Sequence, residues 1–131
     1  LPSGEELASL TGELRASKGA AKLLGRGVEM VALKRGARGS RVYTKGDIIE
    51  IPPYHIEEID PTGAGDCYDA AFIVGLSRGW PLETTAHYAN AVGALATTRL
   101  GPMEGTFEHE YITDFMASQG APLPRSLRNA P

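Results

Sequence analysis

The residues best suited to chemistry lie together in one short stretch, residues 62–66, which reads Thr-Gly-Ala-Gly-Asp. Small residues let a backbone approach a ligand closely, and the apolar pattern after Asp66 predicts a helix that begins there. The free N–H groups of a helix N-terminus bind anions, phosphate above all. An acid beside such a site repels the anion, but it is useful if it accepts a proton. The stretch therefore predicts phosphoryl transfer, with Asp66 as the base for an attacking hydroxyl.

A plainer interpretation of this stretch stays open, in which Asp66 caps its helix and the glycines only form a turn. Two other nucleotide-binding motifs do not fit it. The dinucleotide-binding pattern needs glycine where Tyr68 stands, and the P-loop needs a Gly-Lys-Ser/Thr sequence that the chain lacks. If the phosphate site is real, a side chain at Gly65 should crowd the phosphate and strain the backbone.

The elements that must position this loop follow from turn residues and apolar spacing. Ser3 and Glu6 have the spacing of a capping box at the start of a first helix, in which Leu7, Leu10 and Leu14 follow at helical intervals. The later predictions are a helix over 16–24, strands over 28–33, 40–43 and 48–51, an extended segment over 54–59, and helices over 66–78, 82–100 and 107–117. The helix over 66–78 is apolar nearly all round, which predicts burial.

Length and composition limit the classes of protein to consider. The chain has 131 residues, enough for about one domain, and a net charge of −3, which argues against a general nucleic-acid binder. Its longest apolar run is too short to span a bilayer. The single cysteine, Cys67, excludes an internal disulfide and is predicted to be a small buried filler. The histidines lack metal-ligand spacing and are predicted to lie on the surface or on helix faces: His55, His87 and His109.

The sequence at each end of the chain also supports a prediction. The first residue is Leu1 rather than methionine, so the chain is expected to be an internal piece of a longer protein, with part of an active site upstream. Residues 120–131 contain three prolines and no periodicity, and they are predicted to form a flexible tail after a domain that covers residues 1–119.

Residues 60–66, which read Asp-Pro-Thr-Gly-Ala-Gly-Asp, resemble the C-terminal signature Asp-Thr-x-Gly-Ala-Gly-Asp of the PfkB, or ribokinase-like, carbohydrate kinases. Residues 33–39 resemble that family's strand and Gly-x-x-Gly turn near the nucleotide, and residues 88–101 resemble its late helix and loop beside the adenine. The resemblance extends from about Pro2 to Ala117. It implies an α/β fold, the C-terminal half of a ribokinase-like three-layer α/β/α domain.

The resemblance also implies roles for particular residues. Asp66 matches the catalytic base, and the anion hole matches Gly63, Ala64 and Gly65. Nucleotide contacts are implied for Lys34, Gly36, Gly39 and Asn90. A solvated strand end explains Lys34 equally well, and an amide at a helix interface is the alternative for Asn90.

Two metal sites are implied in the same way. The family's Asn-x-x-Glu motif, which organises magnesium and phosphate through water, is matched at residues 3–6, where Glu6 is kept and Ser3 replaces the asparagine. A capping box explains Ser3 and Glu6 equally well. Asp60, Thr62 and residues 97–101 could supply oxygen ligands for a monovalent cation such as potassium. A turn capped by Asp60 is the alternative there.

Together these features imply an enzyme that transfers the γ-phosphate of ATP, with Mg²⁺, to a hydroxyl of a small sugar or sugar acid. Fructose, ribose, tagatose and 2-keto-3-deoxygluconate all stay open as substrates. The resemblance implies a cytoplasmic protein without nucleic-acid or membrane partners, and an exposed sheet edge at residues 28–33 would favour association, a homodimer included. The alternative is a non-catalytic nucleotide-binding or interaction module that lacks the substrate half.

Overall fold

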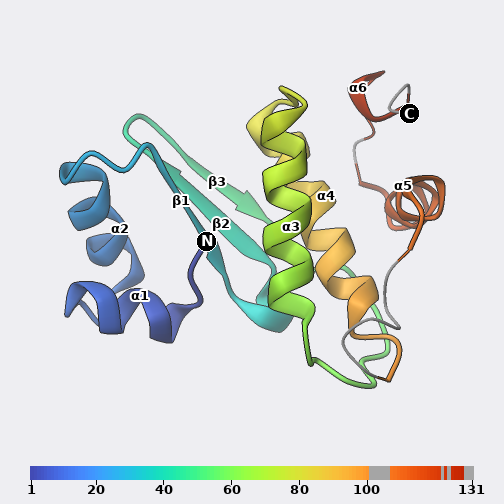
Figure 1. The fold of residues 1–131 in the computed structure, drawn as a ribbon, viewed down its shortest axis with the longest axis horizontal. Helices are drawn as coiled ribbons and strands as arrows, with labels where there is room; N and C mark the ends of the chain where they lie inside the picture. Colours follow the sequence, from blue (N-terminus) through green and yellow to red (C-terminus); the bar gives the residue numbers. More distant parts are fainter. Residues whose placement is uncertain (101–106, 122, 124, 129–131) are drawn as a thin grey trace. The chain divides into compact units, whose positions relative to one another are not determined.

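In the computed structural model, the first of two units, Leu1–Pro53, places two helices before a three-stranded antiparallel sheet (Figure 1). The structure describes residues 1–100, 107–121, 123 and 125–128. The strands are ordered β1-β2-β3, so that each pair is a hairpin. The elements of this unit are α1 (Gly4–Thr11), α2 (Ala16–Gly25), β1 (Met30–Lys34), a 3₁₀ turn η1 (Gly36–Arg38), β2 (Ser40–Thr44) and β3 (Ile48–Ile51).

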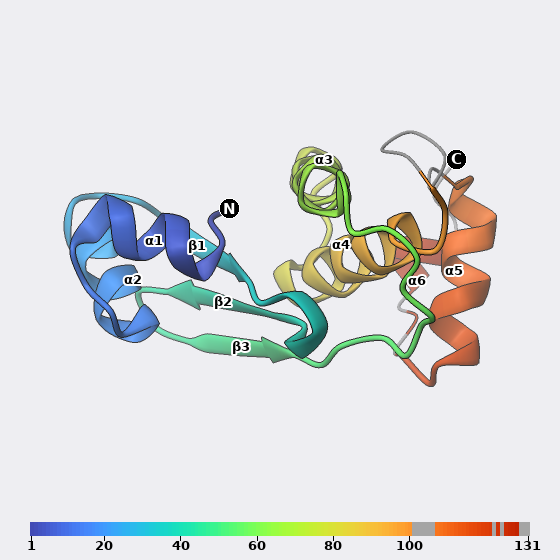
Figure 2. The same cartoon turned by 90° about the horizontal axis from the view of Figure 1, so that it is seen from below.

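The core of this unit forms where both helices cover one face of the sheet (Figure 2). Successive side chains of a strand point to opposite faces, so Val31 and Leu33 of β1 share a face. Tyr43 of β2 is the cross-strand partner of Val31. Leu7 of α1 and Ala20 of α2 pack against these three residues, and all five are buried. The alternate positions Val31 and Leu33 thus face the helices, although Ala32 between them is buried as well.

The first helix begins and ends on local signals. The Ser3 amide donates to the Glu6 carboxylate (2.6 Å) and the Glu6 amide donates to the Ser3 hydroxyl (3.3 Å), which confirms the predicted capping box. Gly12, in the left-handed region with φ 74°, ends α1 at Thr11. Leu14 therefore lies beyond the helix and is 97% exposed, although its spacing suggested that it belonged to the apolar stripe.

The second unit, Tyr54–Pro131, contains the helices α3 (Ala64–Ser77), α4 (Leu82–Ala96), α5 (His109–Ser118) and α6 (Arg125–Arg128). Close packing of α3 on α4 depends on Gly75, because a Cβ there would lie 2.7 Å from the Thr85 side chain. Trp80, in the turn between these helices, is buried, donates its amide to the Gly75 carbonyl (3.0 Å) and packs edge-on against Tyr88. These contacts make Trp80 an anchor of the turn between the two helices.

Several predicted boundaries move by a few residues. The helix expected over 82–100 ends at Ala96. The extended segment 54–59 belongs to no strand of the described sheet. Within it, the backbone of His55 exchanges two hydrogen bonds with the Gln119 side chain (3.1 and 2.9 Å). The predicted tail contains α6, in which Leu127 is buried, and the division at residue 119 stays a prediction.

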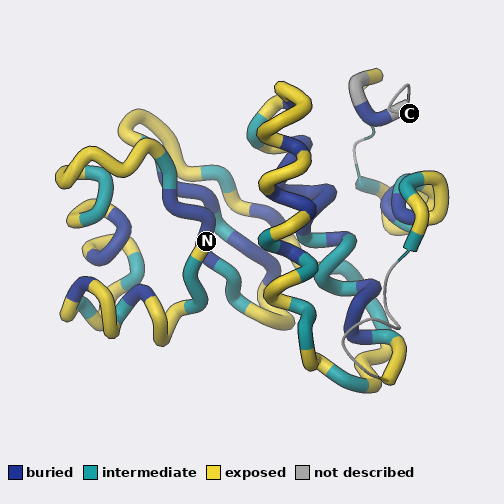
Figure 3. Tube along the Cα trace, viewed as in Figure 1, coloured by how far each residue is buried: buried dark blue, intermediate teal, exposed yellow. Residues whose placement is uncertain are grey.

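The expected burial of α3 all round is wrong. Tyr68, Ala71, Phe72 and Gly75 form a buried face, whereas Ile73 is 59% exposed, and Val74 and Leu76 are exposed too (Figure 3). The apolar composition of a helix indicates which side chains prefer burial, but it does not indicate how many faces of the helix other elements cover. Among the described residues, no helix combines the length and apolar character needed to cross a membrane.

Candidate active site

A tight loop, residues 60–63, leads directly into α3. The sequence predicts the site of phosphoryl transfer at this junction. The Asp60 carboxylate accepts a hydrogen bond from the Thr62 amide (2.9 Å), and the Ala64 amide donates to the Pro61 carbonyl (3.2 Å). Gly63 follows with φ 80°, a left-handed conformation that glycine adopts at little cost. The Cys67 amide then donates to the Gly63 carbonyl (3.0 Å), the first bond of the helix.

The first turn of α3 has the features of an anion site. Gly65 and Asp66 occupy positions at which a helix offers no internal partner for the amide hydrogens. Both residues are exposed, so a ligand in solvent can approach these amides and the Asp66 carboxylate together. The left-handed conformation lies at Gly63, whereas Gly65 is helical. The expected backbone strain at Gly65 is therefore wrong, and crowding of a bound anion is the remaining reason for a small residue there.

The end of α4 holds this loop in place. The Thr97 carbonyl accepts hydrogen bonds from the amides of both Ile59 (2.8 Å) and Asp60 (2.9 Å). A carbonyl oxygen has two lone pairs, so both are occupied. The structure thus brings Asp60 and Thr97 together, as the predicted cation site requires, but it removes the Thr97 carbonyl from the set of available ligands. Gly101, the last residue of that set, lies outside the described residues.

A further contact between α3 and α4 was not predicted from the sequence. A Cβ on Gly93 would lie 3.3 Å from the Ala64 carbonyl oxygen and 3.4 Å from the Tyr68 Cβ. Gly93 therefore lets α4 approach the first turn of α3 closely. Asn90, one helical turn earlier on α4, is half-buried, and its role at the nucleotide stays a prediction. A glycine inside a helical pattern was the one signal that could have indicated this contact.

Cys67 and the histidines are not part of an evident catalytic arrangement. Burial, and after it the charge of Asp66, raise the pKa of the half-buried Cys67 thiol, which disfavours a thiolate nucleophile. His87 lies on the helix α4, in keeping with the predicted helix faces, but it is buried, and that burial lowers its pKa. The ring of His109 contacts the Tyr88 hydroxyl (2.9 Å) through Nδ1 and the Leu127 carbonyl (3.0 Å) through Nε2. These contacts link α5 to α4 and α6.

The other predicted site residues lie in Leu1–Pro53. The Lys34 amide donates to the Pro2 carbonyl (2.9 Å), so the end of β1 lies beside the Ser3–Glu6 capping box. The pKa of Glu6 is lowered chiefly by the hydrogen bond from the Ser3 amide, then by the Ser3 side chain, and then by the charge of Lys34. The geometry of Ser3 and Glu6 is thus that of a cap. In the described part of the chain, no group of three or more His, Cys, Asp or Glu side chains could hold a metal ion.

The turn after β1 contains two glycines with different surroundings. Gly39 has φ 80°, and a Cβ there would lie 2.1 Å from the Ile51 carbonyl oxygen. Gly36 has φ 56°, and a Cβ there would meet nothing within 4 Å. Packing against β3 therefore explains Gly39, whereas Gly36 faces open space that a ligand can enter.

The described geometry defines a partial α/β domain with a glycine-rich loop at the start of a helix, and comparison with known proteins identifies it. Residues 1–109 match the family model described as pfkB family carbohydrate kinase. The chain belongs to this family, as the resemblance of residues 60–66 implied. The fold agrees, because the structure superposes on ribokinase from Arabidopsis thaliana, solved in complex with ribose and ATP, with a TM-score of 0.81. That match has 28% sequence identity and covers 88% of this chain and 39% of that one.

Two curated relatives show how much of a kinase the chain represents. It is 35% identical to inositol 3-kinase from Arabidopsis thaliana over 71 residues, which are 54% of this chain and 20% of that protein. It is 31% identical to 5-dehydro-2-deoxygluconokinase from Bacillus subtilis over 98 residues, which are 74% of this chain and 30% of that protein. The chain thus spans less than a third of these relatives, and their names indicate different substrates.

Proposed function

We propose that this chain is the ATP-binding and catalytic half of a kinase that transfers the γ-phosphate of ATP to a hydroxyl of a sugar or sugar acid. The observation that supports this proposal best is the first turn of α3. There Gly63 adopts φ 80°, and the exposed Asp66 carboxylate lies in the same turn as the amides of Gly65 and Asp66. One exposed turn thus offers both a proton acceptor and an anion site.

The proposed mechanism assigns separate tasks to these groups. Asp66 takes the proton of the attacking hydroxyl, and the amides of Gly63, Gly65 and Asp66 hold the transferred phosphate as its charge develops. The Ala64 amide, which the sequence also placed in this set, already donates to the Pro61 carbonyl (3.2 Å). Mg²⁺, when bound, neutralises the phosphate oxygens of ATP. Glu6 would hold it through water, which suits an exposed carboxylate whose Oε2 is already engaged by the Ser3 amide. Asp60 and Thr62 are proposed for a monovalent cation, now without the Thr97 carbonyl.

Residues 1–131 alone are expected to bind nucleotide weakly at best and to phosphorylate no sugar. Half of an active site cannot exclude water or position a sugar, and both are part of how kinases direct phosphate to the correct acceptor. We would measure ADP release from Mg-ATP with fructose, ribose, tagatose and 2-keto-3-deoxygluconate, together with the mass in solution. Robust phosphorylation by a monomer would contradict the proposed division of the site.

The same panel of sugars, applied to the intact protein with any segments that precede residue 1, tests the proposed function itself. Phosphorylation of any of these sugars or sugar acids supports the enzyme. Tight binding of ATP without turnover on any of them favours the alternative, a nucleotide-binding module.

Gly65→Val is expected to abolish phosphoryl transfer in a protein that still folds. Gly65 is exposed in the first turn of α3 with helical dihedral angles, so valine fits the backbone but brings its methyl groups to the proposed anion site. The helix propensity of valine is no less favourable than that of glycine, and the two differ by less than about 1 kcal/mol, so the substitution is not expected to destabilise α3. The matched control is Gly25→Val at the end of α2, where a Cβ meets nothing within 4 Å. Equal turnover rates for the two variants would show that the loop is only a turn.

A further inference from the structure

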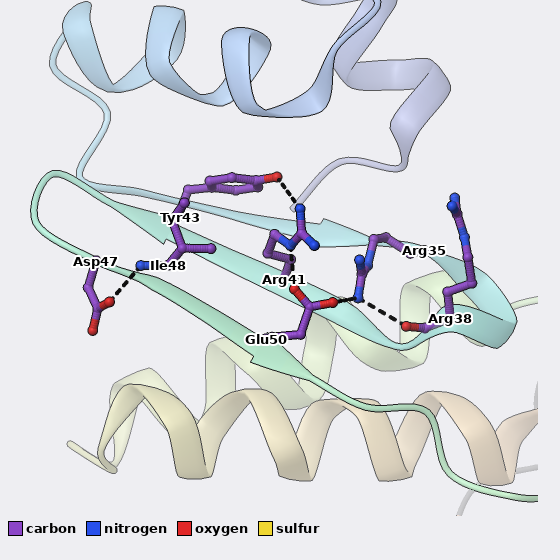
Figure 4. A network of polar contacts seen from close by, with 7 residues as sticks. All are labelled: Arg35, Arg38, Arg41, Tyr43, Asp47, Ile48 and Glu50. Carbon is purple, nitrogen blue, oxygen red and sulfur yellow. Dashed lines mark hydrogen bonds and ion pairs between the residues drawn. The ribbon is translucent and has the colours of Figure 1, made fainter.

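Three arginines and a single glutamate surround the turn between β1 and β2 (Figure 4). The Arg35 guanidinium donates from Nη2 to Oε1 of Glu50 and to the Arg38 carbonyl (3.1 Å). The Arg41 guanidinium donates from Nε to Oε2 of Glu50 (2.5 Å). Glu50 on β3 thus joins two arginines on either side of the turn. These hydrogen bonds, from Arg41 first and Arg35 second, lower the pKa of Glu50, so it is ionised at neutral pH.

Arg35 contacts the Gly36–Gly39 turn at both of its ends. Its amide donates to the Gly39 carbonyl (2.9 Å), and its carbonyl accepts from the Arg38 amide (3.2 Å). Its side chain then folds back to the Arg38 carbonyl and is only 15% exposed. A long arginine side chain loses rotamer entropy when it is held in one conformation, so it needs a strong partner to stay there. Glu50 is that partner.

The position of Glu50 is itself determined by the sheet. Glu50 is the cross-strand partner of Arg41 in the β2–β3 ladder. Arg41 is held in turn by the Tyr43 hydroxyl (3.3 Å) and lies over the Tyr43 ring, 6.0 Å from its centroid. The sheet therefore positions Glu50, Glu50 holds the Arg35 side chain, and Arg35 holds the turn.

We propose that Glu50 is a positioning residue that acts through Arg35 to hold the Gly36–Gly39 turn in the conformation that binds the nucleotide. This inference rests on the proposed function and on the nucleotide contacts that the family resemblance implies for Gly36 and Gly39 of that turn. Positioning and simple electrostatics predict opposite changes in the affinity for ATP when the Glu50 charge is removed. Loss of the Glu50 charge makes the region around three arginines more positive, which by itself would tighten the binding of anionic ATP. Loss of positioning weakens that binding.

The test compares charge-matched variants of the intact protein by calorimetric titration with Mg-ATP. Glu50→Gln keeps the shape of the side chain and removes its charge, and it is expected to raise the Kd about threefold to tenfold. Glu50→Asp keeps the charge and is expected to restore part of the affinity. Glu29→Gln, an exposed position in the same unit that changes the net charge equally, is expected to leave the Kd unchanged or slightly lower.

A second measurement distinguishes positioning from general stability. Amide hydrogen exchange at Arg38 and Gly39 is expected to become faster in Glu50→Gln but not in Glu29→Gln, with similar thermal midpoints for both. A Kd for Glu50→Gln that is unchanged or lower would overturn the inference, even if exchange in the turn became faster. A wild-type protein that binds no Mg-ATP would overturn the proposed function, and this inference with it.

Discussion

Replacing Asp66 by asparagine is expected to lower kcat for phosphoryl transfer about 10²–10⁴-fold while the affinity for ATP changes little. Asparagine has nearly the same size and stays compatible with the first turn of α3, but it cannot accept the proton of the attacking hydroxyl. Asp66 is exposed, so the substitution empties no buried space. The measurement is steady-state kinetics of the intact kinase, together with a titration of nucleotide binding.

Asp114→Asn is the matched control for this experiment. Asp114 is also exposed, on α5, and it undergoes the same change of charge and size. It is expected to retain wild-type turnover. Normal turnover in Asp66→Asn would refute the assignment of the base, whereas equal losses in the two variants would indicate a general effect of charge.

Gly39→Ala is expected to destabilise the unit Leu1–Pro53 by about 3 kcal/mol or more. Its φ of 80° with ψ of −143° is a conformation that side chains rarely adopt. The added Cβ would also lie 2.1 Å from the Ile51 carbonyl oxygen and 2.8 Å from the Pro52 carbonyl carbon. Both contacts are with backbone, which cannot rotate away as a side chain could. The measurement is the free energy of unfolding in urea.

Gly36→Ala provides the comparison within the same turn. Gly36 also has a positive φ, 56°, but a Cβ there meets no atom within 4 Å. Only the left-handed backbone is then penalised, at about 1 kcal/mol. Similar losses of stability in the two variants would show that the close approach of β3 does not determine the residue at position 39.

Much of the architecture could be predicted because its signals are local. The capping box at Ser3 and Glu6 consists of hydrogen bonds between residues three apart. The strand Ile48–Ile51 follows a hairpin turn and was predicted with the same bounds. The start of α3 was placed within two residues, because a run of small residues before an apolar pattern indicates a helix N-terminus. Such interactions are complete within a few residues of sequence.

The sequence by itself therefore determined the family, most elements and the loop that carries the candidate chemistry. Tertiary structure decided which glycine of that loop is left-handed, Gly63 rather than Gly65. It also decided that the Thr97 carbonyl is occupied by amides from residues 59 and 60, and that one face of α3 is left exposed. The occupied carbonyl depends on atoms distant in sequence, and the exposed face depends on how many faces of a helix are covered. Neither apolar spacing nor turn chemistry carries that information, because both describe the preference of a residue and not its neighbours in space.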